Sequence, residues 1–134
     1  MKITGVADTH TALWHVFDDA RLSKRAKTFI DEATIAAHKI AVSVISLAEI
    51  VYLIEKKRLP EAAYDELRRA LADPEDILQE IPLTYDVVEA MRSVPREAIP
   101  DMPDRIVAAT AIYLRVPVIS RDGRIRASTV ETVW

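Results

Sequence analysis

Four acidic residues share one place in the sequence pattern, at the end of an apolar run or at the start of a helical segment. They are Asp8, Glu49, Asp104 and Asp122. In an open α/β sheet, ligands bind outside the carboxyl ends of the strands, so acids from distant segments can meet there. A pocket lined by carboxylate oxygens suits Mg²⁺ or Mn²⁺. The pattern is therefore consistent with a metal site.

Each of these acids also has a local structural explanation. Asp8 can cap the helix that follows it, and Asp104 falls in a first helical turn, where the helix dipole favours negative charge. Ser46 and Glu49 fit a capping box, and Asp122 begins an Asp-Gly turn dipeptide. Taken singly, each acid favours the structural role. Taken together they favour a shared cleft, because four independent caps need not face one another and clustered carboxylates recruit a cation.

The segments that must position these acids alternate between strand and helix patterns. Apolar and β-branched runs predict strands over residues 2–7, 39–45, 76–83, 116–120 and 129–134. Amphipathic patterns and caps predict helices over residues 9–17, 23–37, 46–58, 60–72, 84–94 and 103–115. This alternation favours an α/β fold, with a mainly parallel central sheet of about five strands flanked by helices.

Length and composition narrow the class of protein. A chain of 134 residues is most simply one domain, here residues 1–134. It contains no cysteine, which excludes disulfides and thiolate zinc sites. No apolar stretch approaches the roughly 20 residues that span a bilayer, and Asp8 interrupts the opening run too early for a signal peptide. We therefore expect a soluble, cytoplasmic protein without a membrane partner.

Arginines gather near the last two of these acids. The net charge of −3 and the sequence pI of about 5.6 argue against a general nucleic-acid binder, which would be basic. The later part of the chain nevertheless contains Arg105, Arg115, Arg121, Arg124 and Arg126. Arginines beside an acidic centre could hold phosphates, although charge counts alone favour an ordinary solvated face.

Four short segments around the acids form one pattern. They are V-A-D-T-H at 6–10, S-V-I-S-L-A-E-I at 43–50, D-M-P-D-R-I-V-A-A-T-A at 101–111 and V-I-S-R-D at 118–122. In order, spacing and flanking residues they resemble the PIN domain family, and more narrowly the VapC-like toxin ribonucleases of type II toxin–antitoxin systems. The resemblance extends over nearly the whole chain, including the closing V-E-T-V-W.

The resemblance implies a catalytic and metal-binding role for each acid. Asp8, Glu49 and Asp104 match the main metal-site carboxylates of the family. Asp122 matches an acid that completes the site through water or a second metal. The implied cofactor is Mg²⁺ or Mn²⁺, and the implied reaction is hydrolysis of an RNA phosphodiester to a 5′-phosphate and a 3′-hydroxyl.

Further residues near these motifs are candidates for substrate contact. Thr9 and Ser120 match positions where the family often carries a small hydroxyl residue near the site. Arg121 and Arg124 are candidates to hold flanking phosphates. Arg105 is a third candidate, with an equal alternative as a salt-bridge partner on the helix surface.

The sequence leaves alternative roles for two neighbouring residues, His10 and Asp101. His10 stands where a small residue is common in the family, and a lone histidine beside a helix cap is more often packed or exposed than a metal ligand. Asp101 could assist Asp104 or only cap the helix, and the capping role is favoured.

The resemblance also implies partners: an RNA substrate, a small cognate antitoxin and a second copy of the chain in a homodimer. An antitoxin can place an arginine or lysine among the acids, where it pairs with carboxylates and competes with the metal. We expect Trp14 and Tyr52 to contact such a partner, and Val16 and Phe17 to pack in the core.

Other functions remain open from the residues alone. The fold could serve non-toxin RNA processing, or bind RNA or a partner without catalysis, although the complete set of four acids argues against lost catalysis. A phospho-accepting receiver would need paired acids after the first strand, and a dehalogenase-type phosphatase would need D-x-D there. This chain has Asp8 alone at that point.

Overall fold

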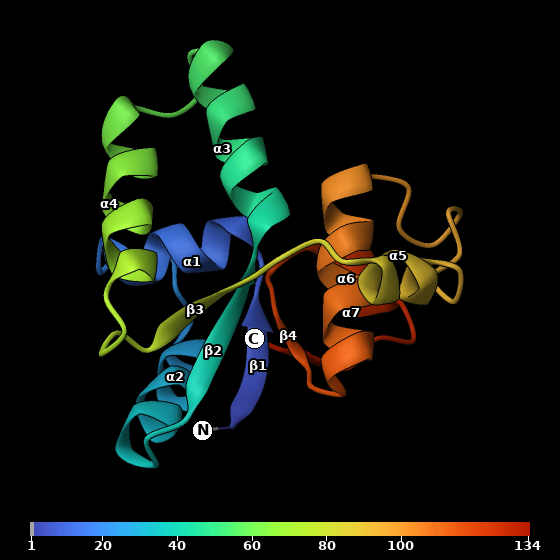
Figure 1. The fold of residues 1–134 in the computed structure, drawn as a ribbon, viewed down its shortest axis with the longest axis horizontal. Helices are drawn as coiled ribbons and strands as arrows, with labels where there is room; N and C mark the ends of the chain where they lie inside the picture. The colour runs from blue at the N-terminus through green and yellow to red at the C-terminus, as the bar shows by residue number, and fades with distance from the viewer. Residues whose placement is uncertain (1) are drawn as a thin grey trace.

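The apolar and β-branched runs form a five-stranded sheet in the computed structural model, which describes residues 2–134 (Figure 1). The strands are β1 (Ile3–Ala7), β2 (Lys39–Ser43), β3 (Leu78–Ile81), β4 (Val118–Ile119) and β5 (Thr132–Val133). All pairs are parallel, in the order β3-β2-β1-β4-β5. The predicted α/β class with a parallel sheet is confirmed.

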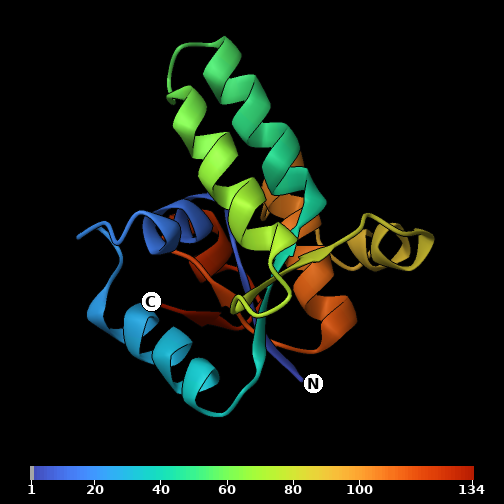
Figure 2. The same ribbon diagram turned by 60° about the vertical axis from the view of Figure 1, so that its left-hand side comes forward.

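Helices cover both faces of this sheet. They are α1 (Thr9–Val16), α2 (Lys24–Ile35), α3 (Val44–Glu55), α4 (Glu61–Ala72), α5 (Tyr85–Met91), α6 (Met102–Leu114) and α7 (Gly123–Ala127). Successive strand residues point to opposite faces. Ala7 belongs to the apolar cluster that includes residues of α1 to α4, whereas Val6 belongs to the cluster that includes residues of α6 and α7. Helices α3 and α4 form a hairpin that projects beyond the sheet (Figure 2).

The strand order contains a reversal next to β1. From β1 the chain builds outward through β2 and β3, and then crosses to the other side of β1 to form β4 and β5. In such sheets, the crevice at the reversal and outside the carboxyl ends of the strands is the usual ligand site. Asp8 follows β1, and its backbone N–H donates to the Ile119 carbonyl of β4 at 3.3 Å. Acids that follow β1 and β4 are thereby brought to one edge of the sheet.

The junction of β2 and α3 differs from the sequence prediction. The predicted strand over residues 39–45 ends at Ser43, because this serine caps α3 by accepting the Ile45 N–H at 3.2 Å. Helix α3 therefore begins at Val44, and Ser46 and Glu49 both lie inside it. The predicted capping box is wrong, and the Glu49 side chain is free for another role.

Helix α7 was not predicted from the sequence. The expected Asp-Gly turn instead begins this helix, and Asp122 caps it by accepting the N–H groups of Arg124 and Ile125. A helix of 5 residues is too short to show a helical period in the sequence.

The end of α1 is more exposed than predicted. Phe17, expected in the core, is 45% exposed because it stands at the C-cap, beyond the last turn of the helix. Val16 is partly buried and packs against the core. Across residues 2–134, the helices are all too short or too polar to cross a membrane.

Candidate active site

Asp8 is oriented by two donors at the amino end of α1. It caps the helix, since its Oδ1 accepts the Thr11 N–H at 3.0 Å. Its Oδ2 accepts the hydroxyl hydrogen of Ser120, a fully buried residue just after β4. Asp8 itself is only 8% exposed. The capping role therefore leaves this carboxylate at the crevice between β1 and β4.

Glu49 reaches from α3 to the first turn of α1. The Thr9 hydroxyl lies 2.6 Å from Glu49 Oε1, to which it donates, and 2.9 Å from Ser46 Oγ. Both Thr9 and Ser46 are buried. Ser46 did not enter the predicted site. Its position one helical turn before Glu49 is the available signal, since residues three apart share a helix face, but the same spacing also fits a capping box.

The surroundings of Asp104 show most directly that the acids lie near one another. Its backbone N–H donates to Asp101 at 3.1 Å, so Asp101 caps α6 as predicted. Burial raises the pKa of the Asp104 carboxyl to about 7, together with the nearby charges of Asp101, Asp122, Glu49 and Asp8, in decreasing order. Carboxylates from four other places in the chain therefore act on a single carboxyl group.

Asp122 and Ser120 connect this group to the loop after β4. The Asp122 N–H donates to Ser120 Oγ at 3.0 Å, while the Ser120 hydroxyl donates to Asp8. Thr9 and Ser120, both predicted to contact substrate, thus each donate to one of the acids. Their positions in the structure suit orientation of the carboxylates.

Within residues 2–134, the acids do not form a closed set of ligands around one point. Residues 2–134 contain no three His, Cys, Asp or Glu side chains close enough together to enclose a metal ion. The donor set nevertheless fits a hard divalent cation, because it consists of carboxylate oxygens and because burial and repulsion by the other acids raise the Asp104 pKa. Mg²⁺ keeps several of its waters and binds through one or two carboxylates, so it does not require a closed cage.

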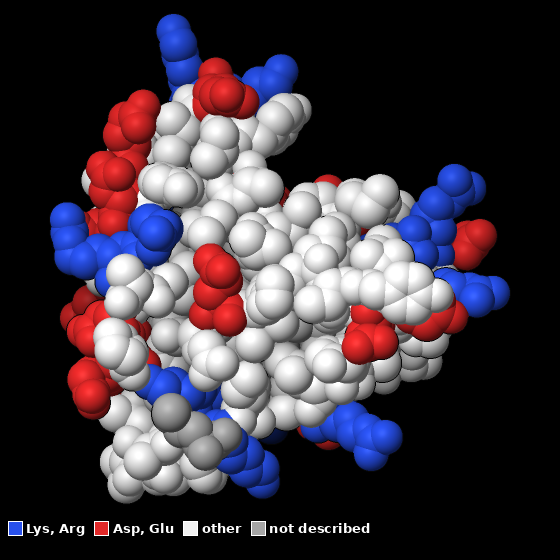
Figure 3. All heavy atoms as spheres, in the orientation of Figure 1, with Lys and Arg blue, Asp and Glu red and all other residues white. Residues whose placement is uncertain are grey.

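The surface has a hollow between α3 and α6, the helices that carry Glu49 and Asp104 (Figure 3). Asp104 lies in the first turn of α6, and α6 contacts α3, which carries Glu49 (Figure 1). Figure 3 shows the surface hollowed between the α3–α4 hairpin and the helices α5 and α6, with acidic atoms visible at the base of the hollow.

The three arginines predicted to hold phosphates lie in different environments. Arg105 donates from Nη2 to the carbonyls of Met91 at 3.2 Å and Val94 at 3.0 Å. Its Nε is buried and finds no partner within residues 2–134. Its guanidinium therefore closes the end of α5, in place of the expected surface ion pair. Arg121 and Arg124 are exposed and accessible to a ligand.

Trp14 is buried, so the prediction that it offers an exposed contact is wrong. Its side chain is only 6% exposed. The His10 ring lies 5.7 Å from it and the Trp134 ring 5.8 Å from it, between centroids. His10 itself is exposed, one turn before Trp14 on α1. Tyr52 on α3 is 54% exposed, as predicted.

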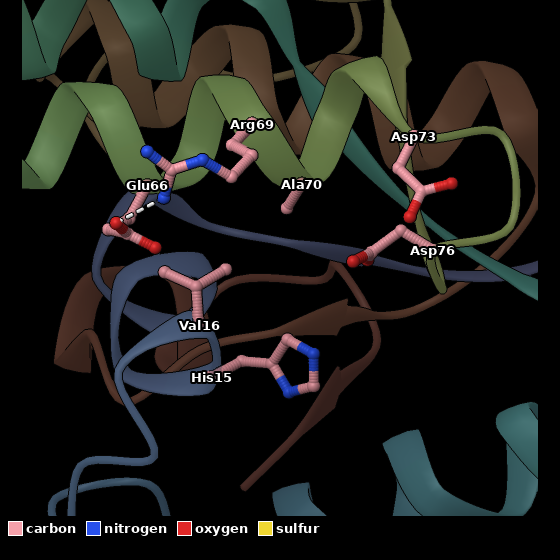
Figure 4. Close-up of a pocket in the computed structure, with 7 residues that line it drawn as sticks. All are labelled: His15, Val16, Glu66, Arg69, Ala70, Asp73 and Asp76. Atoms are coloured by element: carbon pink, nitrogen blue, oxygen red, sulfur yellow. Dashed lines mark hydrogen bonds and ion pairs between the residues drawn. The ribbon is translucent and has the colours of Figure 1, made fainter.

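A second group of polar residues lines a cavity of about 370 Å³ between α1, α4 and the loop before β3 (Figure 4). Its carboxylates have local partners: Glu66 pairs with Arg69, Asp73 accepts the Glu75 N–H at 2.9 Å, and Asp76 accepts the Leu78 N–H at 3.0 Å. Burial lowers the pKa of His15 beside them. None of the four predicted acids lines this cavity.

Comparison with known proteins supports the fold and the resemblance. A sequence model of the PIN domain matches residues 6–129. Ribonuclease VapC22 of Mycobacterium tuberculosis is 28% identical over 134 residues, which cover 98% of each chain.

Solved structures show the same architecture. VapBC2 from Rickettsia felis, crystallised with a DNA fragment from its promoter, has a TM-score of 0.67 and 16% identity, covering 98% of this chain and 100% of that chain. A toxin–antitoxin complex from Klebsiella pneumoniae has a TM-score of 0.62 and 21% identity, covering 98% of this chain and 97% of that chain. At these identities the two likenesses establish the fold alone.

Proposed function

Since this chain belongs to the PIN domain family, we propose that it is a metal-dependent endoribonuclease and the toxin of a toxin–antitoxin pair. One observation carries the proposal: buried donors orient the carboxylates of Asp8 and Glu49, which come from distant parts of the chain, toward the same place. The raised pKa of the Asp104 carboxyl, caused by burial and by the charges of these and two other acids, agrees with this arrangement. Charge accumulated in this way is suited to a divalent cation and, through it, to a phosphate. The similarity to a ribonuclease over nearly the whole chain supports RNA as the substrate.

The four acids would hold the ion, and buried donors would orient them. The Thr11 N–H and the Ser120 hydroxyl hold the Asp8 carboxylate, and the Thr9 hydroxyl holds Glu49. When bound, a divalent ion supplies charge that neutralises a phosphodiester and lowers the pKa of a water molecule. Ligands oriented before the reaction need no rearrangement during it, which is where much of the catalytic effect of such sites arises.

Asp104 is expected to release its proton when the ion binds. Its carboxyl is the one whose pKa is raised, by burial and by the charges of the neighbouring acids. Metal binding should therefore release a proton near pH 6, below the pKa of about 7. The chain's own contribution to the chemistry is thus positioning and charge, and it needs no nucleophilic side chain.

The direct test is cleavage of purified total RNA with Mg²⁺ or Mn²⁺, beside an Asp8→Asn variant and an EDTA control. Asparagine keeps an oxygen that can accept the Thr11 N–H, so the cap and the fold should survive while the charge is lost. The matched control is Asp31→Asn, the same substitution at an exposed position on α2.

Discrete, metal-dependent fragments from the parent and from Asp31→Asn, absent with Asp8→Asn, would support the nuclease. Equal cleavage by Asp8→Asn would mean that the acids are assigned wrongly. No cleavage and no metal binding by the folded parent would leave the four acids with structural roles alone and make a binding module the better assignment.

The proposed antitoxin would be a small cognate protein that covers the site. The similar structure from Klebsiella pneumoniae is described as a toxin–antitoxin complex, which supports such a partner. A cavity of about 390 Å³ beside α1 offers Phe17 and Leu59 to a partner, with Arg58 at its border. Copurification with the product of an adjacent small reading frame, and loss of cleavage in that complex, would support this partner. Full activity in its presence would contradict it.

A further inference from the structure

Trp14 is the centre of a cluster that reaches from α1 to the loop after β4. Its ring has two guanidinium groups near it, with the Arg121 Cζ 4.6 Å and the Arg21 Cζ 5.3 Å from the ring centroid. The rings of His10 and Trp134 complete its surroundings. A tryptophan face attracts a cation by its ring quadrupole, and such contacts order the cation's side chain.

The two arginines on this ring differ in what else they contact. Arg21 donates to Asp19 from Nε at 3.0 Å and from Nη2 at 2.7 Å. The same hydrogen bonds lower the pKa of Asp19 to about 2. Within residues 2–134, by contrast, no hydrogen bond or ion pair engages the Arg121 guanidinium, and Trp14 is its ordered contact. Arg21 is thus neutralised in place, and Arg121 is not.

A stacked guanidinium keeps its hydrogen-bonding edge available. The Arg121 Cζ lies over the Trp14 ring, and a guanidinium stacked on a ring in this position still has the in-plane N–H groups that recognise phosphate, often two at once. Arg121 stands between Ser120, which donates to Asp8, and Asp122, which is one of the acids that raise the Asp104 pKa. The Arg121 backbone therefore lies at the acidic site, and its guanidinium lies over Trp14 on α1, the helix that Asp8 caps. A phosphate bound by Arg121 would lie on the Trp14 side of that site.

We propose that Trp14 is a positioning residue that holds Arg121 as a phosphate-binding group at the border of the acidic site. The proposal rests on the proposed function, because the phosphate is taken to belong to a single-stranded RNA next to the bond that is cut. Arg121 touches the substrate, whereas Trp14 acts through Arg121. Arg21, on the same ring, serves the fold.

The test measures RNA binding separately from cleavage. All variants are made in the Asp8→Asn protein, which should bind without cutting, and binding of a fluorescein-labelled single-stranded RNA of mixed sequence is followed by anisotropy across a salt series. Loss of one phosphate contact should lower the slope of log affinity against log salt by about 0.7. At moderate salt, loss of an exposed ionic contact should weaken binding about two- to fivefold.

Arg121→Gln should show both changes, and Arg21→Gln should show neither. Trp14→Leu should reproduce the change in slope, and Trp14→Phe, which keeps an aromatic face, should restore most of it. Trp14→Leu combined with Arg121→Gln should be no worse than Arg121→Gln alone, because the two residues act as one unit. Additive losses would mean that Trp14 affects binding only through general stability, and would overturn the proposal.

A second measurement does not require Trp14 to be replaced, in case Trp14→Leu does not fold. The chain has 2 tryptophans, so Trp134→Phe leaves Trp14 as the single indole fluorophore. Saturating RNA should change its emission, and Arg121→Gln should abolish that change. Emission that RNA leaves unaltered would overturn the proposal.

The outcomes separate this inference from the proposed function. RNA binding with an unchanged slope in Arg121→Gln overturns the inference and leaves the nuclease untouched. No RNA binding by the Asp8→Asn protein, together with no cleavage by the parent, overturns both.

Discussion

The candidate active site and the cavity of Figure 4 are both rich in acids, yet their charges are handled differently. In the cavity, Arg69 neutralises Glu66, and backbone N–H groups in tight turns hold Asp73 and Asp76. In the site, backbone and hydroxyl donors orient the acids, but burial and the charges of neighbouring acids still raise the pKa of Asp104 to about 7. The comparison teaches that the number of acids does not mark a site. A site is marked by carboxylates that the protein orients but does not neutralise.

The largest effect on cleavage should come from replacing Asp104, the acid whose pKa is raised. If the proposed function holds, Asp104→Asn should lower RNA cleavage at least about 100-fold, because a charge that would face the metal is lost. Glu66→Gln, the same kind of change in the cavity, should leave cleavage unchanged. Single-turnover cleavage at saturating metal measures both, and equal losses in the two variants would remove the distinction between the regions.

A smaller effect is expected from the hydroxyl that holds Glu49. Thr9→Val keeps the shape of the side chain but removes the donor at 2.6 Å from Glu49, so the metal concentration for half-maximal activity should rise about tenfold. Thr9→Ser should restore it. The control is Thr28→Val on the exposed side of α2. An unchanged metal requirement in Thr9→Val would show that the hydroxyl does not orient the acid.

The dependence of stability on pH should also differ between the two regions. The pKa of Asp104 is raised from 3.8 to about 7 in the folded chain, so ionisation opposes folding, and this penalty grows as pH rises from about 4 to 7. In EDTA, Asp104→Asn should therefore gain stability over the parent across that window and keep the gain above it. Thermal unfolding at several pH values measures it. A gain that is largest at the acid end would contradict the assigned direction.

The smallest effect is expected within the cavity. Glu66→Gln removes an exposed pair with Arg69, three residues apart on α4, and should change the free energy of unfolding by no more than about 0.5 kcal/mol. Urea unfolding would measure it. A loss of several kcal/mol would mean that the cavity's charges are coupled in a way that its local hydrogen bonds do not suggest.

Much of the fold could be predicted because its signals are local. Ser23 and Thr84 begin α2 and α5 as predicted, since each caps its helix through a nearby N–H. The errors have local causes too. Ser43 caps α3 before the predicted start at Ser46, and helix α7 is too short to show a period. Competing serines three residues apart cannot be ranked from the sequence, because both satisfy the same capping rule.

The sequence by itself determined the alternation of strands and helices, and with it the parallel sheet that brings separate acids to one edge. These follow from periodicities of two and of 3.6 residues, which depend on near neighbours only. Tertiary structure alone decided that Trp14 is buried, that Arg121 lies over its face, and that Arg105 faces the carbonyls at the end of α5. The physical reason is distance along the chain: β5 brings Trp134 against Trp14, and burial and repulsion depend on such through-space contacts.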